Sequence, residues 1–382
     1  MIAIEAVLSI AIPIIIFVLI LSVVVFVHEL GHFLAARRAG VFVEEFALGM
    51  GPKLLYVKGR PQPKTGPLEE GEDPEEATIY SIRMFPIGGF CAMRGQDDSR
   101  PDDPQSLSNK TVGQRMLVMA GGSLMNFLLA FVLFATLVLL MGYSVAEVRS
   151  LPVGSPAQVA GLQVGDRITH VNGQRVSLFE NFLLQLEFSG GQPMDVRFDR
   201  DGVRHNLQIT PVAVAANTYR LGFQPVRRYG LLDEVSDGYR RVGVLGTLGT
   251  AAEMMLFNIR VPFIMLARAV SGQSLPPGAD VMGPIGMAGE VTQIYQAVIQ
   301  QGILDTVLTM MFFAALLSTA LGFFNLLPIP AMDGARLVFL AIEGIRRKPV
   351  SPERESLVHM VGFVALILLA VFIAYRDIVR LL

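Results

Sequence analysis

Two histidines and a glutamate stand close together near the start of the chain, in the segment His28-Glu29-Leu30-Gly31-His32. Side chains four residues apart on a helix point the same way, so both imidazoles can bind one zinc ion. The glutamate between them can take a proton from a water on that metal, which is metalloprotease chemistry. With five histidines in 382 residues, coincidence explains the motif poorly. The competing interpretation is a pair of helix histidines hydrogen-bonded to neighbouring helices.

The motif ends an uncharged apolar run, Val7–Val27. A stretch of about 20 apolar residues is long enough to cross the hydrocarbon core of a bilayer. This run lacks the basic start and the small-residue cleavage site of a removable signal peptide. The predicted metal site therefore lies within a membrane-spanning segment, where ionisable residues usually serve a function.

Composition indicates a polytopic membrane protein with some water-exposed mass, because 52% of the residues are hydrophobic and 17% are charged. The net charge of −2 gives no sign of a nucleic-acid partner, and none is expected. Three more uncharged windows bring the predicted spanning helices to four: Met116–Ala146, Thr306–Met332 and Leu357–Tyr375. Glu253–Ala267 carries two charges and a proline, so we expect it to lie at the membrane interface.

Lysine and arginine predict the orientation, because basic residues accumulate in cytosolic loops. Basic residues follow the first span and also mark the loop before the fourth span: Arg37, Arg38, Lys53, Lys58, Arg60 and Lys64, then Arg336, Arg346, Arg347, Lys348 and Arg354. Both loops are therefore expected in the cytosol, and Ser150–Asp305 on the extracytoplasmic side of the membrane. The lone Cys91 excludes an intrachain disulfide.

The far end of the third span offers a third metal ligand. Asn325–Gly334 contains Pro328, Pro330 and Asp333 where an apolar helix should be ending. Prolines force irregular backbone, which is tolerated at membrane depth only when it is buried in protein or lines a wet cavity. The predicted topology brings Asp333 to the same membrane face as the histidines. Two histidines and a carboxylate leave the fourth zinc position open for water, although a plain helix stop with Asp333 among the headgroups is the alternative.

These residues resemble the bacterial site-2 proteases of the regulator-of-sigma-E-protease type, through H-E-x-x-H at His28–His32 and N-x-x-P-x-P-x-x-D-G at Asn325–Gly334. The resemblance implies one zinc ion per chain held by His28, His32 and Asp333, with Glu29 as general base and Asn325 positioning the substrate. Ser123 stands where the family often has proline. Four other stretches resemble the family and add Gly88, Gly89 and Asn126 as expected substrate-positioning residues: Phe46–Pro52, Phe85–Phe90, Gly122–Asn126 and Met282–Gly286.

Between the first two spans, three segments have the β-branched and aromatic content of short strands: Val41–Phe46, Lys53–Val57 and Thr78–Met93. The resemblance implies a membrane-dipping β-hairpin, and we expect its edge around Ile82–Phe90 to pair with substrate as an added strand. The bland alternative is a small subdomain that only covers helix ends. The proline-rich acidic insert at residues 59–77 is expected to be disordered and to carry no chemistry.

The segment from Val153 to Gly173 resembles a bacterial PDZ domain, which we place at residues 145–226. Such domains bind extended peptides at a strand edge, so this one could bind substrate tails, screen substrates by bulk, or act only as a spacer. His170 and His205 within it are expected at the surface rather than on a metal.

The predicted fold class is a polytopic α-helical membrane protein with four transmembrane helices, a cytosolic-side β-hairpin region and one extracytoplasmic PDZ domain of α+β type. The predicted order is residues 1–40 (first span), 41–115 (hairpin region), 116–144 (second span), 145–226 (PDZ domain), 227–304 (outer helical linker), 305–335 (third span), 336–356 (cytosolic loop) and 357–380 (fourth span).

The predicted function is zinc-dependent proteolysis of single-span membrane proteins, such as anti-sigma factors or remnant signal peptides, in the bacterial cytoplasmic membrane. The lipid bilayer is an expected partner, and peptide tails are expected at the PDZ domain. One rival is a non-proteolytic PDZ scaffold with a structural zinc, for which Glu29 would be superfluous. The other is a zinc transporter, which normally needs ionisable groups along several spans.

Overall fold

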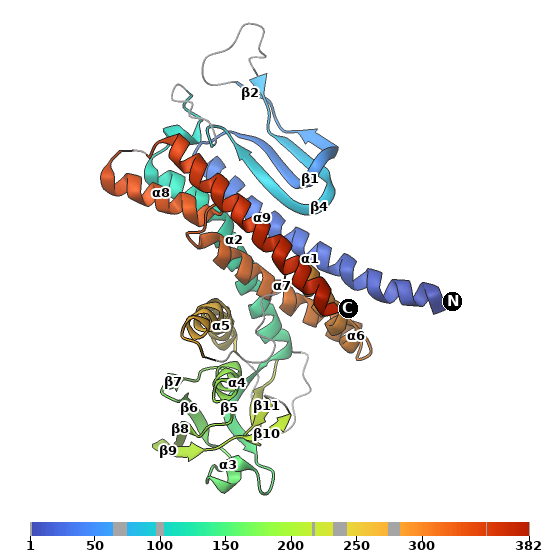
Figure 1. The fold of residues 1–382 in the computed structure, drawn as a ribbon, viewed down its shortest axis with the longest axis vertical. Coiled ribbons are helices and arrows are strands. Elements are labelled where there is room, and N and C mark those ends of the chain that lie inside the picture. The colour runs from blue at the N-terminus through green and yellow to red at the C-terminus, as the bar shows by residue number, and fades with distance from the viewer. Residues whose placement is uncertain are drawn as a thin grey trace. The chain divides into compact units, whose positions relative to one another are not determined.

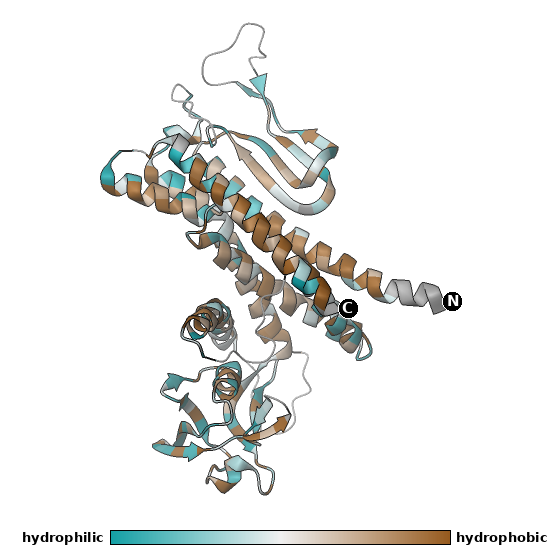
Figure 2. Cartoon of the chain, in the orientation of Figure 1, coloured by the Kyte–Doolittle hydropathy of each residue, from teal (hydrophilic) through white to brown (hydrophobic). Residues whose placement is uncertain are grey.

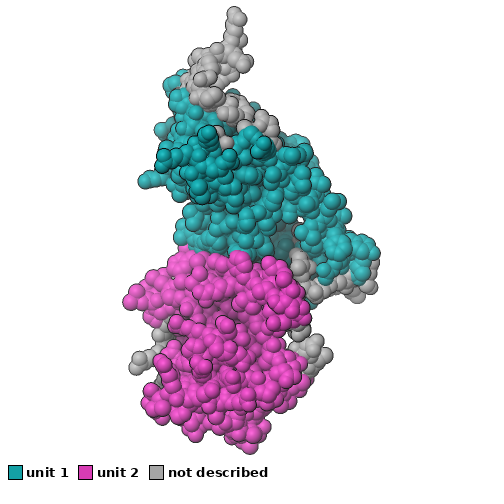
Figure 3. Space-filling view, turned by 60° about the vertical axis from the view of Figure 1, so that its left-hand side comes forward, with its two compact units in different colours: residues 1–130, 282–382 teal, residues 131–281 magenta. Residues whose placement is uncertain are grey.

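A computed structural model describes residues 2–63, 75–96, 103–215, 218–231, 243–273, 283–348 and 350–381. The chain folds into two compact units (Figure 1 and Figure 3). The first comprises residues 1–130 and 282–382, and it contains every predicted metal ligand and catalytic residue. The second comprises residues 131–281 and contains the predicted PDZ domain.

Long apolar helices dominate the first unit, and Figure 2 shows hydrophobic residues along most of their length. Its helices are α1 (Ile2–Arg38), α2 (Val112–Met141, which continues into the second unit), α6 (Pro284–Ile299), α7 (Ile303–Leu326), α8 (Asp333–Arg346) and α9 (Pro352–Leu381). Within the described residues, five helices are long and apolar enough to cross a membrane: α1, α2, α7, α9 and α5 (Val244–Val270). The sequence predicted four spans and an interfacial segment within α5, and that count stays a prediction.

Helices α1 and α2 cross at a pair of glycines beside the histidine motif. A Cβ added to Gly31 would lie 2.1 Å from the carbonyl oxygen of Gly121, so only glycine allows the two backbones to approach this closely. Helix α1 ends at Arg38. Two residues later, Gly40 adopts a left-handed φ of 70°, and its N–H donates to the carbonyl oxygen of Arg37. The crossing brings the backbone of α2 against the face of α1 that carries both histidines.

Helix α6 packs among the other apolar helices. Its Val291 is fully buried with Phe17 of α1 and Met310 of α7. These residues belong to the segment 227–304 that was predicted to be an extracytoplasmic or interfacial helical linker, and their mixed polarity gave no sign of a buried face. The start of α6 is also bound to α9, because the N–H groups of Gly283 and Gly286 both donate to Asp377. Met282, the first residue of that glycine motif, lies outside the described residues.

The predicted hairpin forms from β1 (Val43–Lys58) and β4 (Ile79–Met93), and both strands bend back on themselves. Phe46 pairs with Cys91 on one side and with Tyr80 on the other, while Ile82 pairs with both Leu48 and Leu55. The curled sheet therefore ends in Gly89–Met93 of β4 at one edge and Lys53–Lys58 of β1 at the other. The prediction of a free edge at Ile82 is wrong, because this residue is paired on both sides. The alternating polarity of a strand does not show whether it has one neighbour or two.

The ends of the acidic insert are tied to the hairpin. Two short strands, β2 (Gln62–Pro63) and β3 (Glu75–Glu76), pair with each other, and residues 64–74 lie outside the described part. The carboxylate of Glu76 forms an ion pair with the buried guanidinium of Arg94. The same guanidinium forms an ion pair with Asp103 at 3.0 Å. The expected disorder therefore does not extend to Glu76, which neutralises a buried arginine, whereas the absence of functional chemistry in the insert stays a prediction.

The second unit is built on a sheet in the order β12-β5-β6-β8-β9, with β7 paired to β6. Its elements are β5 (Tyr143–Ser150), α3 (Pro156–Val159), β6 (Arg167–Val171), β7 (Gln174–Arg175), α4 (Phe179–Phe188), β8 (Met194–Arg200), β9 (Val203–Ile209), β10 (Val212–Ala215), β11 (Thr218–Arg220) and β12 (Gln224–Arg228). The first strand of this fold, β5, pairs with its last strand, β12, through Tyr143 and Arg228. These two residues lie close to the predicted domain bounds 145 and 226. Its core includes Ile168, Phe182 and Phe198.

Candidate metal centre

The structure brings His28, His32 and Asp333 together on α1 and at the start of α8. The Nε2 atoms of the two histidines are 3.2 Å apart, and Oδ2 of Asp333 lies 3.2 Å from each of them. Both imidazoles are buried. Three lone-pair atoms thus converge at equal spacing, from residues about 300 positions apart in the sequence.

This triangle has the dimensions that a tetrahedral zinc site needs. A regular tetrahedron with an edge of 3.2 Å has its centre about 2.0 Å from each corner, which is the usual length of Zn–N and Zn–O bonds. Two neutral imidazoles and a carboxylate are also a donor set found in catalytic zinc sites. The residues therefore fit a zinc ion with three protein ligands and an open fourth position.

A tight turn between α7 and α8 places Asp333. Helix α7 ends at Leu326, before the two prolines, and α8 begins at Asp333 itself. A Cβ added to Gly334 would lie 2.1 Å from the carbonyl oxygen of Leu327, so the turn closes only with glycine there. At its other end, α8 is tied to α2 by an ion pair between Glu343 and Arg115. Proline, glycine and this ion pair together fix where α8 starts.

The second nitrogen of each histidine has a partner on α2. Nδ1 of His32 donates to the carbonyl oxygen of Val118 at 2.8 Å, which leaves Nε2 free of a proton and able to bind metal. Nδ2 of the Asn126 amide lies 3.3 Å from Nδ1 of His28, and the buried Oδ1 of the same amide has no hydrogen-bond partner. With Oδ1 turned toward His28, the same amide accepts the Nδ1 proton and leaves that Nε2 free as well. This orientation of the amide also gives the buried Oδ1 a donor, and it leaves Nε2 of His28 able to bind a metal.

Gly122 of α2 forms the floor under both imidazoles. A Cβ added there would lie 2.5 Å from Nε2 of His32 and 2.7 Å from Nε2 of His28. No side chain fits at this position without displacing the histidines. Two consecutive glycines, Gly121 and Gly122, stand in an apolar helix and could have indicated from the sequence that another helix packs closely against this one.

We expect Gly122→Ala to weaken zinc binding roughly 10–100-fold, because the new methyl group must push both imidazoles out of line. Zinc content of the purified variant, measured by elemental analysis after dialysis against a chelator, tests this. Gly113→Ala is the matched control, since it lies on the same helix and a Cβ there meets nothing within 4 Å. Equal zinc retention by both variants would show that close packing of Gly122 against the two imidazoles is not needed for zinc binding.

Glu29 and Asn325 line one cavity of about 310 Å³ with the three ligands. Glu29 stands on α1 between the histidines, and the backbone N–H of Cys91 in β4 donates to its carboxylate. Phe90, Cys91 and Met93 of β4 also line this cavity. Burial, and then the charge of Glu29, raise the pKa of the Cys91 thiol to about 12, so Cys91 presents a neutral thiol. The cavity thus combines a metal-binding triangle, a carboxylate, an amide and the edge of a strand.

The remaining predicted positions divide into two groups. Gly89 lies at the cavity, because a Cβ there would meet Cγ of Glu29 at 3.4 Å. Gly88 faces Met50 within the hairpin and is not among the cavity-lining residues. Asn126 is fully buried, and its amide contacts the candidate metal ligand His28 instead of lining the cavity. Sequence reasoning included Gly122 only in a family-like stretch and missed its contact with both imidazoles. It also missed the Val118 carbonyl, and it placed the free hairpin edge around Ile82–Phe90 and not at Gly89–Met93.

Comparison with known proteins agrees with this geometry. The profile of peptidase family M50 matches residues 16–369. A Clostridium perfringens protein that carries the name of a zinc metalloprotease is 33% identical over 360 residues, covering 94% of this chain and 96% of the relative. The zinc metalloprotease RasP of Shouchella clausii is 30% identical over 448 aligned positions, covering 96% and 98%. The regulator of sigma-W protease RasP of Bacillus subtilis is 28% identical, with the same coverage.

Among solved structures, the PDZ domain of an SdrC-like protein from Listeria monocytogenes is similar to 22% of this chain and matches over 90% of its own length. The sequence identity is 21% and the TM-score is 0.20.

Proposed function

Since the chain belongs to peptidase family M50, we propose that it is an intramembrane zinc metalloendopeptidase that cuts the transmembrane segments of single-span proteins. The observation that carries this proposal is the 3.2 Å triangle of His28, His32 and Asp333 with Glu29 beside it, at the end of an apolar helix long enough to cross a bilayer. The relatives are named as zinc metalloproteases, so the family supplies the identity of the metal.

His28, His32 and Asp333 would hold one zinc ion per chain. When bound, zinc supplies Lewis-acid chemistry, which polarises a carbonyl group and lowers the pKa of water. Val118 and Asn126 hold the two imidazoles with their Nε2 atoms facing Asp333. The cavity beyond these atoms leaves room for water and for a substrate carbonyl.

Glu29 is the general base of the proposed reaction. It takes a proton from the attacking water and then passes that proton to the nitrogen of the leaving amine, while the C–N bond of the peptide breaks. The N–H donated by Cys91 holds the carboxylate at the cavity. Asn325, on α7, offers an amide donor to the substrate backbone in the same cavity.

A helical substrate must unwind before its backbone carbonyl can be attacked, and each hydrogen bond lost in lipid costs several kcal/mol. The edge at Gly89–Met93 of β4 is suited to replace those bonds, because it borders the cavity and has β1 on one side only. We propose that an unwound substrate segment adds to this edge as a strand. This moves the proposed contact from Ile82, which is paired on both sides, to the residues beside Glu29.

The substrates we propose are single-span regulatory proteins, such as anti-sigma factors, in a bacterial cytoplasmic membrane. The B. subtilis relative is named as a regulator of sigma-W protease, and the apolar helices support a membrane location. The basic residues around Arg37 and Arg346 favour a site near the cytosolic face, with residues 143–228 outside. That outer region would bind, screen or only space the outer tails of substrates.

The proposal is tested by cleavage of a purified single-span protein in liposomes, before and after zinc is removed from the enzyme by a chelator. We expect cleavage to stop when zinc is removed and to return when about one equivalent is added back. A rate that is unchanged in the zinc-free enzyme would contradict the proposed function.

A further inference from the structure

The corner that precedes Asp333 has an unusual backbone. Ala331 adopts a φ of 73°, in the left-handed region that residues with a Cβ rarely occupy. Such a conformation persists only where the surroundings impose it. Asp333 follows two residues later, so the direction in which the chain leaves Ala331 decides where the carboxylate lies.

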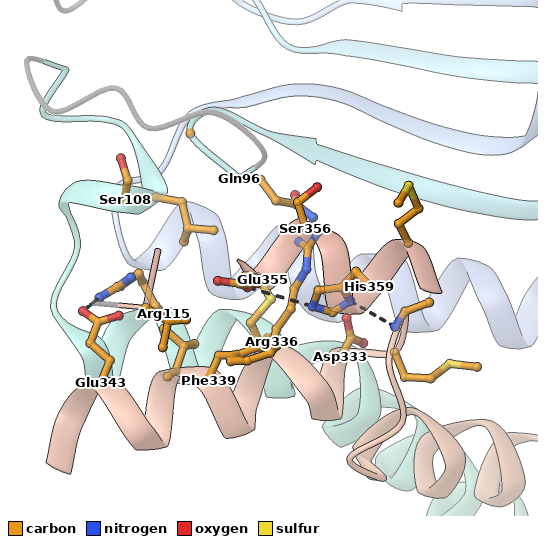
Figure 4. Close-up of a pocket in the computed structure, with 18 of the residues that line it drawn as sticks. Gln96, Ser108, Arg115, Asp333, Arg336, Phe339, Glu343, Glu355, Ser356 and His359 are labelled. Carbon is orange, nitrogen blue, oxygen red and sulfur yellow. Dashed lines mark hydrogen bonds and ion pairs between the residues drawn. The ribbon is translucent and has the colours of Figure 1, made fainter. Parts of the chain in front are cut away.

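A side chain of α9 holds Ala331 in this left-handed conformation. Nδ1 of His359 accepts a hydrogen bond from the N–H of Ala331 at 3.0 Å, the contact drawn from His359 to the corner in Figure 4. The acceptor role of Nδ1 places the imidazole proton on Nε2, on the side of Glu355. The His359 ring also packs on Phe339 of α8, with 5.9 Å between the centroids. One side chain thus contacts both the corner and the helix that begins with Asp333.

A second contact of α9 supports the same corner. A Cβ added to Gly362 would lie 2.0 Å from Cβ of Pro330, so α9 packs its bare backbone on the proline. Gly362 follows His359 by three residues, on the same face of the helix. His359 and Gly362 together hold Pro330 and Ala331 from α9, an element that carries no metal ligand among the described residues.

We propose that His359 is a positioning residue for the metal centre. By accepting the N–H of Ala331, it holds the left-handed corner and thereby keeps Asp333 within reach of His28 and His32. Without this acceptor, the N–H of Ala331 would lose the protein partner that the structure gives it, and the strained left-handed corner would be free to relax. Asp333 would then lose its alignment. This inference rests on the proposed zinc site and adds a residue outside the family motifs quoted above.

Three substitutions separate the hydrogen bond from the bulk of the side chain. In His359→Asn, the amide oxygen is as many bonds from Cα as Nδ1 and can accept the same N–H. In His359→Leu, a side chain of similar shape to asparagine offers no acceptor. In His359→Gln, the acceptor stands one bond further out, at the reach of Nε2.

The readout is zinc retained by the purified full-length protein against increasing chelator. Thermal unfolding in the same detergent reports whether each variant is folded. We expect His359→Asn to retain zinc like the wild type, and His359→Leu and His359→Gln to bind it roughly 10–100-fold more weakly, as for other residues that orient metal ligands. If His359→Leu does not fold, the zinc affinities of His359→Asn and His359→Gln are compared instead, and a weaker affinity in His359→Gln supports the inference.

Packing offers an independent test. Gly362→Val pushes α9 away from Pro330 and should weaken zinc binding as His359→Leu does. Ala370→Val is the control, because it introduces the same side chain at an exposed position of α9. The inference is overturned if His359→Leu and His359→Gln hold zinc as tightly as the wild type, or if His359→Asn is as weak as they are. A wild-type protein that binds no zinc would instead overturn the proposed function itself.

Discussion

Glu29→Gln is expected to reduce cleavage by about 10²–10⁴-fold while the protein keeps its zinc. Glutamine has nearly the shape of glutamate and can still accept the N–H of Cys91. It cannot take a proton from water, so the step that generates the nucleophile is lost. Initial cleavage rates on a single-span substrate, together with zinc content of the same preparations, measure both halves of this prediction.

The control for Glu29→Gln is Glu290→Gln, which makes the same change at an exposed position of α6 and should leave the rate unaltered. A Glu29→Gln enzyme that cleaves at a near-normal rate would show that another group is the base. It would also favour the rival interpretation of a structural zinc in a membrane scaffold, because such a site has no use for this carboxylate.

The double variant His28→Ala, His32→Ala is expected to lose both zinc and cleavage. It removes two of the three converging ligand atoms and leaves a single carboxylate, which cannot hold zinc against a chelator. Elemental analysis of the purified protein should fall from about one zinc per chain to background. Zinc retained at full occupancy would exclude this site.

The matched control replaces two histidines outside the site, His170 and His205, with alanine. Both belong to the second unit, and neither is in the metal-ligand cluster found among the described residues. Zinc content and cleavage should both stay at the wild-type level. Loss of zinc from this control would mean that the protein binds its metal somewhere else.

Local sequence was sufficient to predict the parts of the site that depend on helix geometry. A four-residue spacing fixes the common direction of His28 and His32, and the prolines after Asn325 predict an irregular segment that carries Asp333. The strand content of Thr78–Met93 likewise predicted β4. Membership of the family is confirmed by the match over residues 16–369, whereas the roles of individual site residues stay predictions.

The contacts that sequence reasoning did not reach are those between elements far apart in the chain. Asn126 was expected to position substrate, yet its amide lies on His28, because the rotation of α2 about its axis is set by the glycine crossing with α1. Ile82 was expected at a free edge, but a strand that bends back gains a second neighbour without changing its alternation. His359 is the one histidine in the predicted span Leu357–Tyr375, and nothing in the sequence connects it to Ala331, which the structure places beside it.

The central claim is that the bond cut lies within a membrane-spanning segment. The most direct test is the mass of the two products made from a single-span substrate in liposomes by the zinc-loaded enzyme. We expect two fragments whose masses place the cut inside the apolar segment, and neither fragment with Glu29→Gln. Fragments that place the cut in a water-exposed tail, or an intact substrate after incubation with enzyme that has its zinc, would contradict it.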